Sequence, residues 1–479
     1  MTTAKNDKLT SLRERFPLIH NIVISATDLV KIETARSGAK TGRLGAKRVC
    51  SLYDPVGEAV KFAASLKIKP GDHVALYGVG LGYHLKPLLD AVGDDGQVVA
   101  AEVNASLLKA AIGVIDERVI DDARLTLVCG RDEGSFLPDW SRAFAAMDPD
   151  RTKVAIHIPS FQLIPENFPK TKNAVEMIRM ERRFPLVMGG YQTDNFRKNL
   201  TVVLKSSGIA TLAGAIKGGV AAVVGAGPSL DKQIPFLSQF RYSAVLCSDT
   251  AAPALIKRSI IPDMIFTVDP QKETKLHFDM VGQLDIPLAL VPTANCDVVS
   301  QWPGPLYFGF IDPGRFSGPA QAFAKRMGAL KSGGSVSCFA LETALMMEAE
   351  TVILFGQDFC FNRDQIHASG TVPAMLGDNM YVDEEIVSER DYFGREVKTS
   401  RSLYGYRREF ENLTKSCRAS VYTLSPEGVC LAGIEPIPSP LPYMSAVANS
   451  CCLADIKNRP KQKAGGEVAR SFLDWIDRI

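Results

Sequence analysis

The sequence predicts an α/β protein with two Rossmann-like parallel-sheet domains joined by helices, and a small helical C-terminal region. Three observations support this prediction. Short apolar segments alternate with amphipathic segments over two long stretches of the chain, as they do in βαβ units. Between these stretches, charged sequence that favours helix replaces the strand pattern. A glycine-rich turn follows an early strand of each series, at the place where a Rossmann unit turns from strand to helix.

The composition is that of a folded, globular protein. The 479 residues are 46% hydrophobic and carry a formal net charge of +2, so the chain can bury the cores of two or three domains. Lys and Arg are scattered rather than gathered in a stripe, which argues against a nucleic-acid partner. The chain opens without a signal-peptide pattern and has no apolar stretch of the ~18 residues that a membrane helix needs. We therefore expect a cytoplasmic protein with no membrane partner.

The cysteines indicate no structural metal. All ten are spread along the chain without a C-x-x-C pair or a Cys/His cluster. Such spacing is typical of reduced thiols rather than of a zinc site or a disulfide framework. We expect no metal and no resident cofactor.

Residues 1–45 are expected to form an N-terminal helical arm, and residues 46–165 the first Rossmann-like domain. SLYDPVGEAVKFAASLKIKP predicts an amphipathic helix that ends before Pro70. GDHVALYGVGLGYHLKPLLDAV then has the pattern of strand, glycine turn and helix. DGQVVAAEVNASLLKAAI predicts the next strand and helix, and RLTLVCG and KVAIHIP predict later strands.

Residues 166–215 are expected to form a helical connection, because NAVEMIRMERRF and FRKNLTVVLKSSGIATLAG are charged and favour helix. The second strand series begins in the domain at residues 216–433 and runs through SAVLCSDTAAPALI, DMIFTVDP, PLALVPTAN, PLYFGFI and ETVILFGQDF. Residues 434–479 form a tail that opens on IEPIPSPLP, whose prolines disfavour regular structure, and closes on a short amphipathic helix, VARSFLDWIDRI.

The segment AAVVGAGPSLDKQIPFL opens the second domain with a candidate phosphate loop. A buried strand ends at Val224, after which Gly225 and Gly227 allow a tight or positive-φ backbone, and Pro228 is tolerated in a first helical turn. Free N–H groups and the positive end of the helix dipole suit a phosphate there, and Ser229 adds a hydroxyl donor. Glycines at such a crossover also serve packing alone, and the loop is not a full G-x-G-x-x-G fingerprint.

Small polar or acidic residues also follow the later strands of this domain. Asp249 and Thr250 follow one strand, and Asp269 follows the next. Taken singly, each acid is typical of a helix N-cap or a turn. An open parallel sheet, however, places the carboxyl ends of its strands on one rim, where nucleotides bind. Further candidates for this nucleotide-binding rim are Gly334, Ser335 and Ser337 in the turn 333–337, and Gly356, Gln357 and Asp358 at a later strand end.

These motifs together resemble a known family. GAGPSL, SDTA followed by ALIKRSIIPD, TVDP, the GGSVS turn and GQDF with a downstream His-Ala are similar to the motility-associated factor family, the flagellin nonulosonic acid transferases, whose central domain is of the DUF115 type. The resemblance extends to YDPVGEA, to GVGLGYH and to LYGYRREFE through SPEGVCLAG. It therefore covers roughly residues 51–433.

The resemblance implies a transferase that moves pseudaminic or legionaminic acid from its CMP-activated form to Ser or Thr of flagellin in the cytoplasm, with CMP-sugar and flagellin as its partners. The central domain also resembles bacterial sialyltransferases, whose CMP site has an Asn on each of two strands; here Asp249 and Asp269 stand at those places. His367 occupies the position of the catalytic histidine of those enzymes, and Asp358 of GQDF is the second catalytic candidate. His277 reads as an ordinary helix residue.

Three other functions remain open. An archaeal branch of the same domain type comprises 6-hydroxymethylpterin diphosphokinases, for which Asp249 and Asp269 would hold magnesium beside ATP. A methyltransferase is suggested by LYGVGLGYH with Glu102, although Tyr77 stands near the place of the acid that such a turn needs. A non-catalytic scaffold is the third. The D-x-D at Asp148 to Asp150 lies between strands of the first domain, where its proline explains it as a turn.

Overall fold

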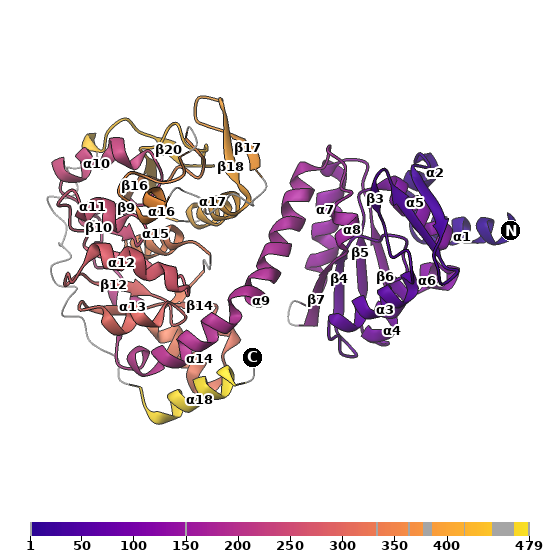
Figure 1. Ribbon diagram of the computed structural model, residues 1–479, viewed down its shortest axis with the longest axis horizontal. Coiled ribbons are helices and arrows are strands. Elements are labelled where there is room, and N and C mark those ends of the chain that lie inside the picture. Colours follow the sequence, from indigo (N-terminus) through magenta and orange to yellow (C-terminus); the bar gives the residue numbers. More distant parts are fainter. Residues whose placement is uncertain are drawn as a thin grey trace. The chain divides into compact units, whose positions relative to one another are not determined.

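The computed structural model describes residues 2–148, 151–331, 334–362, 365–376, 386–415, 417–442 and 464–477. The chain divides into two compact units, Met1–Arg183 and Phe184–Ile479. The boundary lies inside the long helix α9, Pro169–Val203. Each unit has its own parallel sheet with helices packed against it and its own hydrophobic core (Figure 1).

The first unit begins with two helices and a small antiparallel sheet. The elements are α1 (Thr2–Arg15), α2 (Pro17–Ser25), β1 (Val30–Thr34), β2 (Lys40–Leu44) and β3 (Lys47–Arg48). We expected residues 1–45 to form a helical arm, but the sheet β1-β2-β3 occupies much of its second half. Gly38, with a φ of +85°, lies in the turn that joins β1 to β2. The helices α1 and α2 are as predicted.

The main sheet of the first unit has four parallel strands in the order β6-β5-β4-β7, the order of one half of a Rossmann fold. Apolar residues fill both of its faces, as expected of a parallel sheet between helices. The prediction of a first Rossmann-like domain is thus confirmed. Its elements are α3 (Pro55–Ser65), β4 (His73–Tyr77), α4 (Leu85–Val92), β5 (Val98–Ala101), α5 (Ala105–Val114), α6 (Glu117–Asp121), β6 (Leu125–Val128), α7 (Glu133–Ala145), β7 (Thr152–Ile156) and α8 (Ile158–Phe161).

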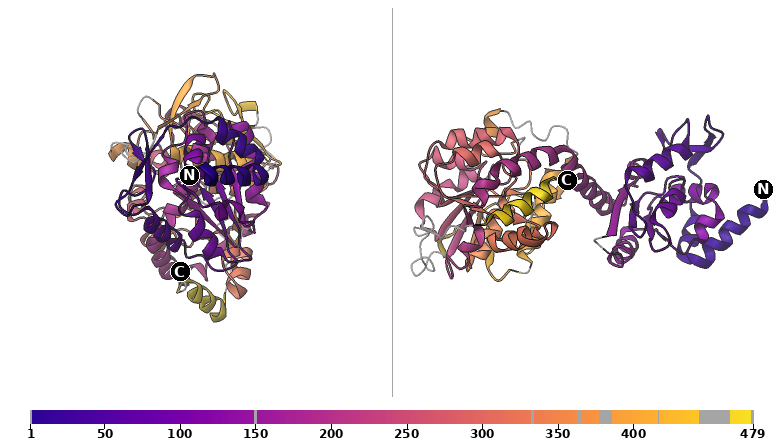
Figure 2. Two further views of the ribbon diagram at one scale, coloured as in Figure 1. Left: turned by 90° about the vertical axis from the view of Figure 1, so that its right-hand side faces the viewer. Right: turned by 90° about the horizontal axis from the view of Figure 1, so that it is seen from below.

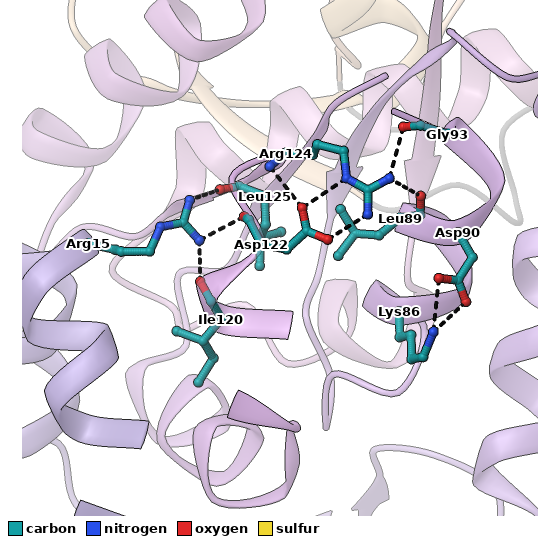
Figure 3. Close-up of polar contacts among 9 residues, drawn as sticks. All are labelled: Arg15, Lys86, Leu89, Asp90, Gly93, Ile120, Asp122, Arg124 and Leu125. Carbon is teal, nitrogen blue, oxygen red and sulfur yellow. Dashed lines mark hydrogen bonds and ion pairs between the residues drawn. The ribbon is translucent and has the colours of Figure 1, made fainter. Parts of the chain in front are cut away.

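Two arginines satisfy carbonyl groups at the ends of helices in this unit (Figure 3). Arg124 donates to the carbonyls of Leu89, at 3.1 Å, and Gly93, at 2.9 Å, at the end of α4, and pairs with Asp122. Arg15, the last residue of α1, donates to the carbonyls of Ile120 and Asp122. Because the last carbonyls of a helix have no partner within it, these guanidinium groups stabilise both helix ends.

The second unit is built on one sheet of nine parallel strands, in the order β20-β19-β16-β9-β10-β11-β12-β13-β8. The chain enters at the edge strand β8, passes to the central β9 and proceeds along one side to β13, and the later strands β16, β19 and β20 are added on the other side of β9. The order therefore reverses next to β9, which is the switch point where ligands bind in such sheets. The prediction of a second parallel-sheet domain is confirmed.

The elements of the second unit follow the predicted alternation closely. In order they are β8 (Ser207–Gly208), η2 (Ile209–Leu212), β9 (Val220–Val224), α10 (Leu230–Gln239), β10 (Ala244–Ser248), α11 (Ala252–Ile256), β11 (Met264–Thr267), η3 (Lys272–Thr274), α12 (Lys275–Val281), β12 (Leu288–Leu290), α13 (Cys296–Gln301), β13 (Leu306–Phe308), β14 (Phe310–Ile311), η4 (Pro313–Arg315), α14 (Gly318–Met327), β15 (Ala329–Leu330), α15 (Val336–Met346), β16 (Thr351–Phe355), α16 (Val372–Leu376), β17 (Ile386–Arg390), β18 (Glu396–Ser400), α17 (Arg401–Thr414), β19 (Ser420–Thr423), β20 (Glu435–Pro436) and α18 (Gly466–Ile476).

Helix α15 is central to this unit because it packs across β9, β10 and β11. Its residues from Cys338 to Ala344 are buried, so the helix runs through the core. In a right-handed βαβ unit the helix runs opposite to the strands, and its N-terminus therefore points to the carboxyl edge of the sheet. This direction positions the site described below.

The C-terminal helix α18 is the last described element, drawn in yellow in Figures 1 and 2. It packs against α14, with Phe472 and Ile476 buried, which confirms the predicted C-terminal helix. IEPIPSPLP, expected to be irregular, contributes the two-residue edge strand β20, where a proline is tolerated. Within the described residues, no helix combines the length and the apolar character needed to cross a membrane.

Candidate functional site

A cavity of about 580 Å³ opens at the carboxyl edge of the nine-stranded sheet. Its wall consists of the loops that follow β9, β10, β11, β12 and β16, together with the N-terminus of α15. The predicted site residues that line it are Gly227, Thr250, Asp269, Gly334, Ser335, Ser337, Gly356, Gln357, Asp358 and His367. Gly225, Pro228, Ser229 and Asp249 lie outside its lining. The sheet therefore brings most of the predicted rim together.

The loop after β9 packs tightly against the loop after β16. The N–H of Gly225 donates to the carbonyl of Phe355, at 2.8 Å, and the N–H of Gly227 to the carbonyl of Gly356, at 2.9 Å. A Cβ on Gly225 would lie 2.4 Å from Nε2 of Gln357. We expected Gly225 and Gly227 to allow a tight or a positive-φ backbone; both lie in close contact with the β16 loop, and of these three glycines only Gly356 has a positive φ, at +59°. The two glycines of GAGPSL are needed for close approach, not for an unusual backbone.

The N-terminus of α10 is occupied by a side chain of the protein itself. The N–H of Ser229 donates to Oδ2 of Asp358 over 2.7 Å. A carboxylate there satisfies an N–H that has no partner within the helix and interacts favourably with the helix dipole. The structure thus corrects the expectation that this helix end is free to hold a phosphate.

The hydroxyl of Ser229 is also engaged. It lies 2.8 Å from the hydroxyl of Ser425, and the amide of Gln233 donates to it at 2.9 Å. The other end of the Gln233 side chain accepts from the N–H of Gly356 at 2.8 Å. Pro228 precedes these residues in the turn before α10. This network holds α10 and the β16 loop together. Ser229 therefore stabilises the contact between them and does not line the cavity.

The N-terminus of α15, by contrast, opens into the cavity. Ser335 is its N-cap, and its side chain makes no capping hydrogen bond. Gly334, Val336 and Ser337 line the cavity beside it, and the hydroxyl of Ser337 accepts from the amide of Gln357 at 3.1 Å. The first N–H groups of a helix suit an anion. Gly333, predicted in this turn, lies outside the described residues.

Asp358 is the most constrained residue of the cavity wall. Its side chain is buried, and burial raises the pKa of its carboxyl, while the hydrogen bonds from Ser229 act in the opposite direction. Oδ1 has no hydrogen-bond partner among the described residues. The next residue, Phe359, has a φ of +51°, which is uncommon for a bulky side chain and often marks a functional site. One oxygen of Asp358 therefore anchors α10, and the other is buried without a hydrogen-bond partner among the described residues.

His367 lies in the loop that faces the cavity from beyond β16. The N–H of Ala368 donates to the carbonyl of Ala226 at 2.8 Å, and the N–H of Ser369 donates to Asp231 at 2.9 Å. These bonds attach the histidine loop to the GAGPSL loop and to the first turn of α10. An imidazole held in a polar cavity is well suited to take a proton from a substrate.

The two acids that follow β10 and β11 have different places. Asp249 is buried, and its Oδ1 accepts from the N–H and the hydroxyl of Thr250, at 2.7 and 3.1 Å. Asp269 lines the cavity, and its Oδ1 accepts from the N–H of Gln271 at 2.9 Å. Burial raises the pKa of Asp269, and the nearby Asp249 raises it further. Asp249 thus stabilises the turn that it belongs to, while Asp269 lines the cavity.

The sequence reasoning missed several residues of the wall. They come from α9, from the loops after β11 and β12, and from α17: Gln192, Gln271, Thr293, Ser402 and Tyr406. Of the α17 residues, Tyr406 belongs to LYGYRREFE, a segment that the resemblance did include, and Ser402 directly precedes this segment. Gln192 stands in QTDNFRKNL, where its spacing from Asn195 and Asn199 was the available signal.

The glycine turn of the first unit is filled by the protein's own side chains. The ring of His157 lies against Gly80, so that a Cβ there would be 2.6 Å from Cε1, and a Cβ on Gly82 would be 2.1 Å from Cγ1 of Ile115. The carboxylate of Glu102 accepts from the N–H of Val79 at 3.1 Å and from that of Asn104 at 3.0 Å. The turn and the acid that suggested a methyltransferase are therefore engaged within the unit.

The expected turn of the D-x-D motif lies partly outside the described residues, which omit Pro149 and Asp150. Among the residues that the structure does describe, no three His, Cys, Asp or Glu side chains gather as a metal site would require.

Residues 194–364 match a family model described as 6-hydroxymethylpterin diphosphokinase MptE-like. This range contains GAGPSL, SDTA, TVDP, GGSVS and GQDF. The match supports the prediction of a DUF115-type domain over these residues.

No curated protein sequence matches the chain. Among solved structures, the chain is similar to the MAf glycosyltransferase from Magnetospirillum magneticum AMB-1, with 16% sequence identity and a TM-score of 0.47; the match covers 100% of this chain and 81% of that one.

Proposed function

We propose that the chain is a glycosyltransferase that moves pseudaminic or legionaminic acid from its CMP-activated form to Ser or Thr hydroxyls of flagellin in the cytoplasm. The cavity of about 580 Å³ carries this proposal, because the N-terminus of α15, two carboxyl groups and His367 all line it. The motifs that resemble the motility-associated factor family support the choice of donor and acceptor.

The chemistry requires few groups. The bond between the anomeric carbon and the phosphate oxygen breaks, and its electron pair leaves with CMP. The acceptor hydroxyl forms the new bond to that carbon, and its proton passes to His367. The N-terminus of α15 and the hydroxyl of Ser335 would stabilise the charge on the leaving phosphate. Both groups line the same cavity.

Asp358 would assist the departure of CMP. Burial raises the pKa of its carboxyl, which favours the protonated form. A proton on Oδ1, the oxygen without a partner among the described residues, could be donated to the leaving phosphate. His367 and Asp358 would thus serve as base and acid, in the way that enzymes separate two such roles by environment.

Intact-mass measurement of flagellin incubated with the full chain and each CMP-nonulosonate tests this proposal. We expect one mass increment per transferred sugar, and a rate lower by roughly 10²- to 10⁴-fold for His367→Ala. CMP affinity should be retained in this variant, and His20→Ala in the first unit serves as the control. Flagellin modified at the normal rate by His367→Ala would exclude this histidine as the base.

A diphosphokinase is the second candidate, because the matching family model carries that description. Three phosphates of ATP would lie beside Asp269, whose carboxylate repels them unless a cation intervenes. Sugar transfer in excess chelator therefore separates the candidates. We expect transfer to persist in chelator. Asp249→Asn should reduce transfer less than Asp249→Ala, because the amide oxygen of Asn can still accept from Thr250. Activity that is lost in chelator and restored by magnesium would favour the diphosphokinase.

A further inference from the structure

The cavity extends well beyond the groups assigned to phosphate. In the sheet order, β9 is followed by β10, β11 and β12, and neighbouring strands lie ~4.8 Å apart. The loop after β12 is therefore about 14 Å from the loop after β9. Residues of both loops line the same cavity. A phosphate near β9 leaves room for a nucleoside toward β12.

The far end of the cavity carries uncharged polar groups. Gln192, Gln271 and Thr293 line it together with Asp269. The side chains of the first three make no hydrogen bond among the described residues. Val268, Pro270 and Val291 supply apolar wall beside them. Amides set in an apolar wall suit a flat polar ring, such as a nucleobase.

Gln192 is held in place by its own helix. Asn195 and Asn199 lie three and seven positions after it, and residues at this spacing share one face of a helix. The amide of Asn195 donates to the carbonyl of Pro270 at 2.8 Å, and that of Asn199 to the carbonyls of Pro292, at 3.0 Å, and Ala294, at 2.8 Å. Both asparagines are buried. This part of α9 is therefore fastened to the loops after β11 and β12.

The backbone at Asp269 is also held by hydrogen bonds. Its carbonyl accepts from the N–H of Asn295 at 3.1 Å, and the side chain of Asn295 donates to the carbonyl of Gln271 at 2.9 Å. Since Asn195 binds the carbonyl of Pro270, three consecutive residues of this loop are fixed. The wall is thus preorganised rather than mobile, which is the condition for reading a ligand by hydrogen bonds.

We propose that Gln192 of α9, together with Asp269, reads the edge of the nucleobase and selects cytosine over uracil. The exocyclic amine of cytosine would donate to the carboxylate of Asp269, and the amide of Gln192 would donate to a ring acceptor. Uracil presents a carbonyl in place of the amine, so it would face the carboxylate unfavourably. This inference rests on the proposed function, because it assumes a CMP-activated donor.

Calorimetric titration of the full chain with CMP, UMP and ribose 5-phosphate tests the inference. We expect wild type to bind CMP at least about tenfold more tightly than UMP. Gln192→Ala should weaken CMP by about 3- to 10-fold and leave ribose 5-phosphate, which has no base, unchanged. Asp269→Asn should reduce the preference for CMP over UMP, because an amide can donate as well as accept. Lys198→Ala, exposed on the same helix, is the matched control.

The outcomes separate the inference from the proposed function. Equal binding of CMP and UMP, with no effect of Gln192→Ala, would overturn the base-reading role while leaving a nucleotide donor in place. A loss of ribose 5-phosphate binding in Gln192→Ala would show that Gln192 supports the site as a whole, which also overturns it. If wild type bound neither nucleotide, the proposed function itself would fail, and the inference with it.

Discussion

Gly227 shows how tightly two loops meet at the site. A Cβ at this position would lie 2.5 Å from Oδ2 of Asp358 and 2.7 Å from the backbone oxygen of Gly356. We predict that Gly227→Ala displaces the β16 loop, lowers the melting temperature by several degrees, at about 2–4 °C per kcal/mol, and abolishes CMP binding. Differential scanning fluorimetry and calorimetric titration measure both effects.

Gly405 provides the matched control, because it lies inside α17 with nothing within 4 Å of a Cβ. Gly405→Ala should be neutral or stabilising, by about 1 kcal/mol or less, with CMP affinity unchanged. A Gly227→Ala protein with wild-type melting and wild-type affinity would show that the close approach of these loops has no part in the site.

Because Glu102 is buried, we predict that the stability of the first unit depends on pH. Burial raises its pKa from 4.5 to about 7, so the folded unit binds this proton more tightly than the unfolded chain does. Its contribution to stability is therefore fully present below pH 4.5 and is lost as pH rises to 7. Burial lowers the pKa of the neighbouring His84 from 6.5 to about 4, so the His84 contribution is present above pH 6.5 and is lost as pH falls toward 4.

We predict that Glu102→Gln gains stability relative to wild type by roughly 2–3 kcal/mol between pH 4.5 and pH 8. Hydrogen exchange of the peptides that contain β4 and β5 measures it in the full chain. Variant and wild type are compared at each pH, so that the chemical exchange rate cancels. A ratio of protection that stays constant across this range would contradict the assignment.

At the scale of single residues, most of the predicted site residues line the cavity. Several of them, however, make contacts other than those predicted. Gly225 and Gly227 were expected to allow a tight or a positive-φ backbone; they allow the close approach, and Gly356 has the positive φ. Ser229 was expected at a phosphate and is hydrogen-bonded to Asp358 and Ser425. Such roles depend on the approach of the β16 loop, which lies more than 120 residues along the chain, and no local pattern reports it.

At the scale of elements, α9 is predicted to stabilise the site through Asn199. Its amide donates to the carbonyls of Pro292 and Ala294, and both carbonyls would lose this partner in Asn199→Ala. The cost of such a loss is about 1–3 kcal/mol. We expect a melting temperature lower by about 2–4 °C per kcal/mol lost, measured by scanning fluorimetry. Lys198→Ala, one residue away and exposed, should melt like wild type, and equal melting of the two variants would contradict the prediction.

Two helix N-termini were predicted to lie at the nucleotide, and the structure distinguishes between them. Both α10 and α15 follow a glycine-containing turn and point their N-termini to the same edge of the sheet. The GAGPSL motif predicted a phosphate at α10, but Asp358 accepts a hydrogen bond from the N–H of Ser229 at this helix end. The GGSVS turn leads into α15, whose N-cap side chain makes no capping bond. Sequence shows that a helix begins at a turn, but not which distant carboxylate reaches it.

At the scale of the whole molecule, hydrophobic patterning predicted both parallel sheets and the helical connection, because buried strands are long apolar runs between glycine turns. The edge strand β8, Ser207–Gly208, and the sheet β1-β2-β3 were not predicted. Two small residues carry no strand signal, and β1 to β3 are mostly polar, with only Thr41 and Gly42 of β2 buried. Helices and strands whose burial requires an apolar pattern were thus predicted from the sequence, and strands without such a pattern were missed.

We propose that a CMP-linked donor binds in the cavity with its phosphate at the N-terminus of α15. Hydrogen–deuterium exchange of the full chain with and without CMP tests this binding mode, because α10 and α15 can be followed as separate peptides. We predict increased protection in residues 334–342 and in the loop at residues 356–360, with the first turn of α10 unchanged. Protection confined to residues 228–234, or exchange that CMP does not alter anywhere in the second unit, would contradict it.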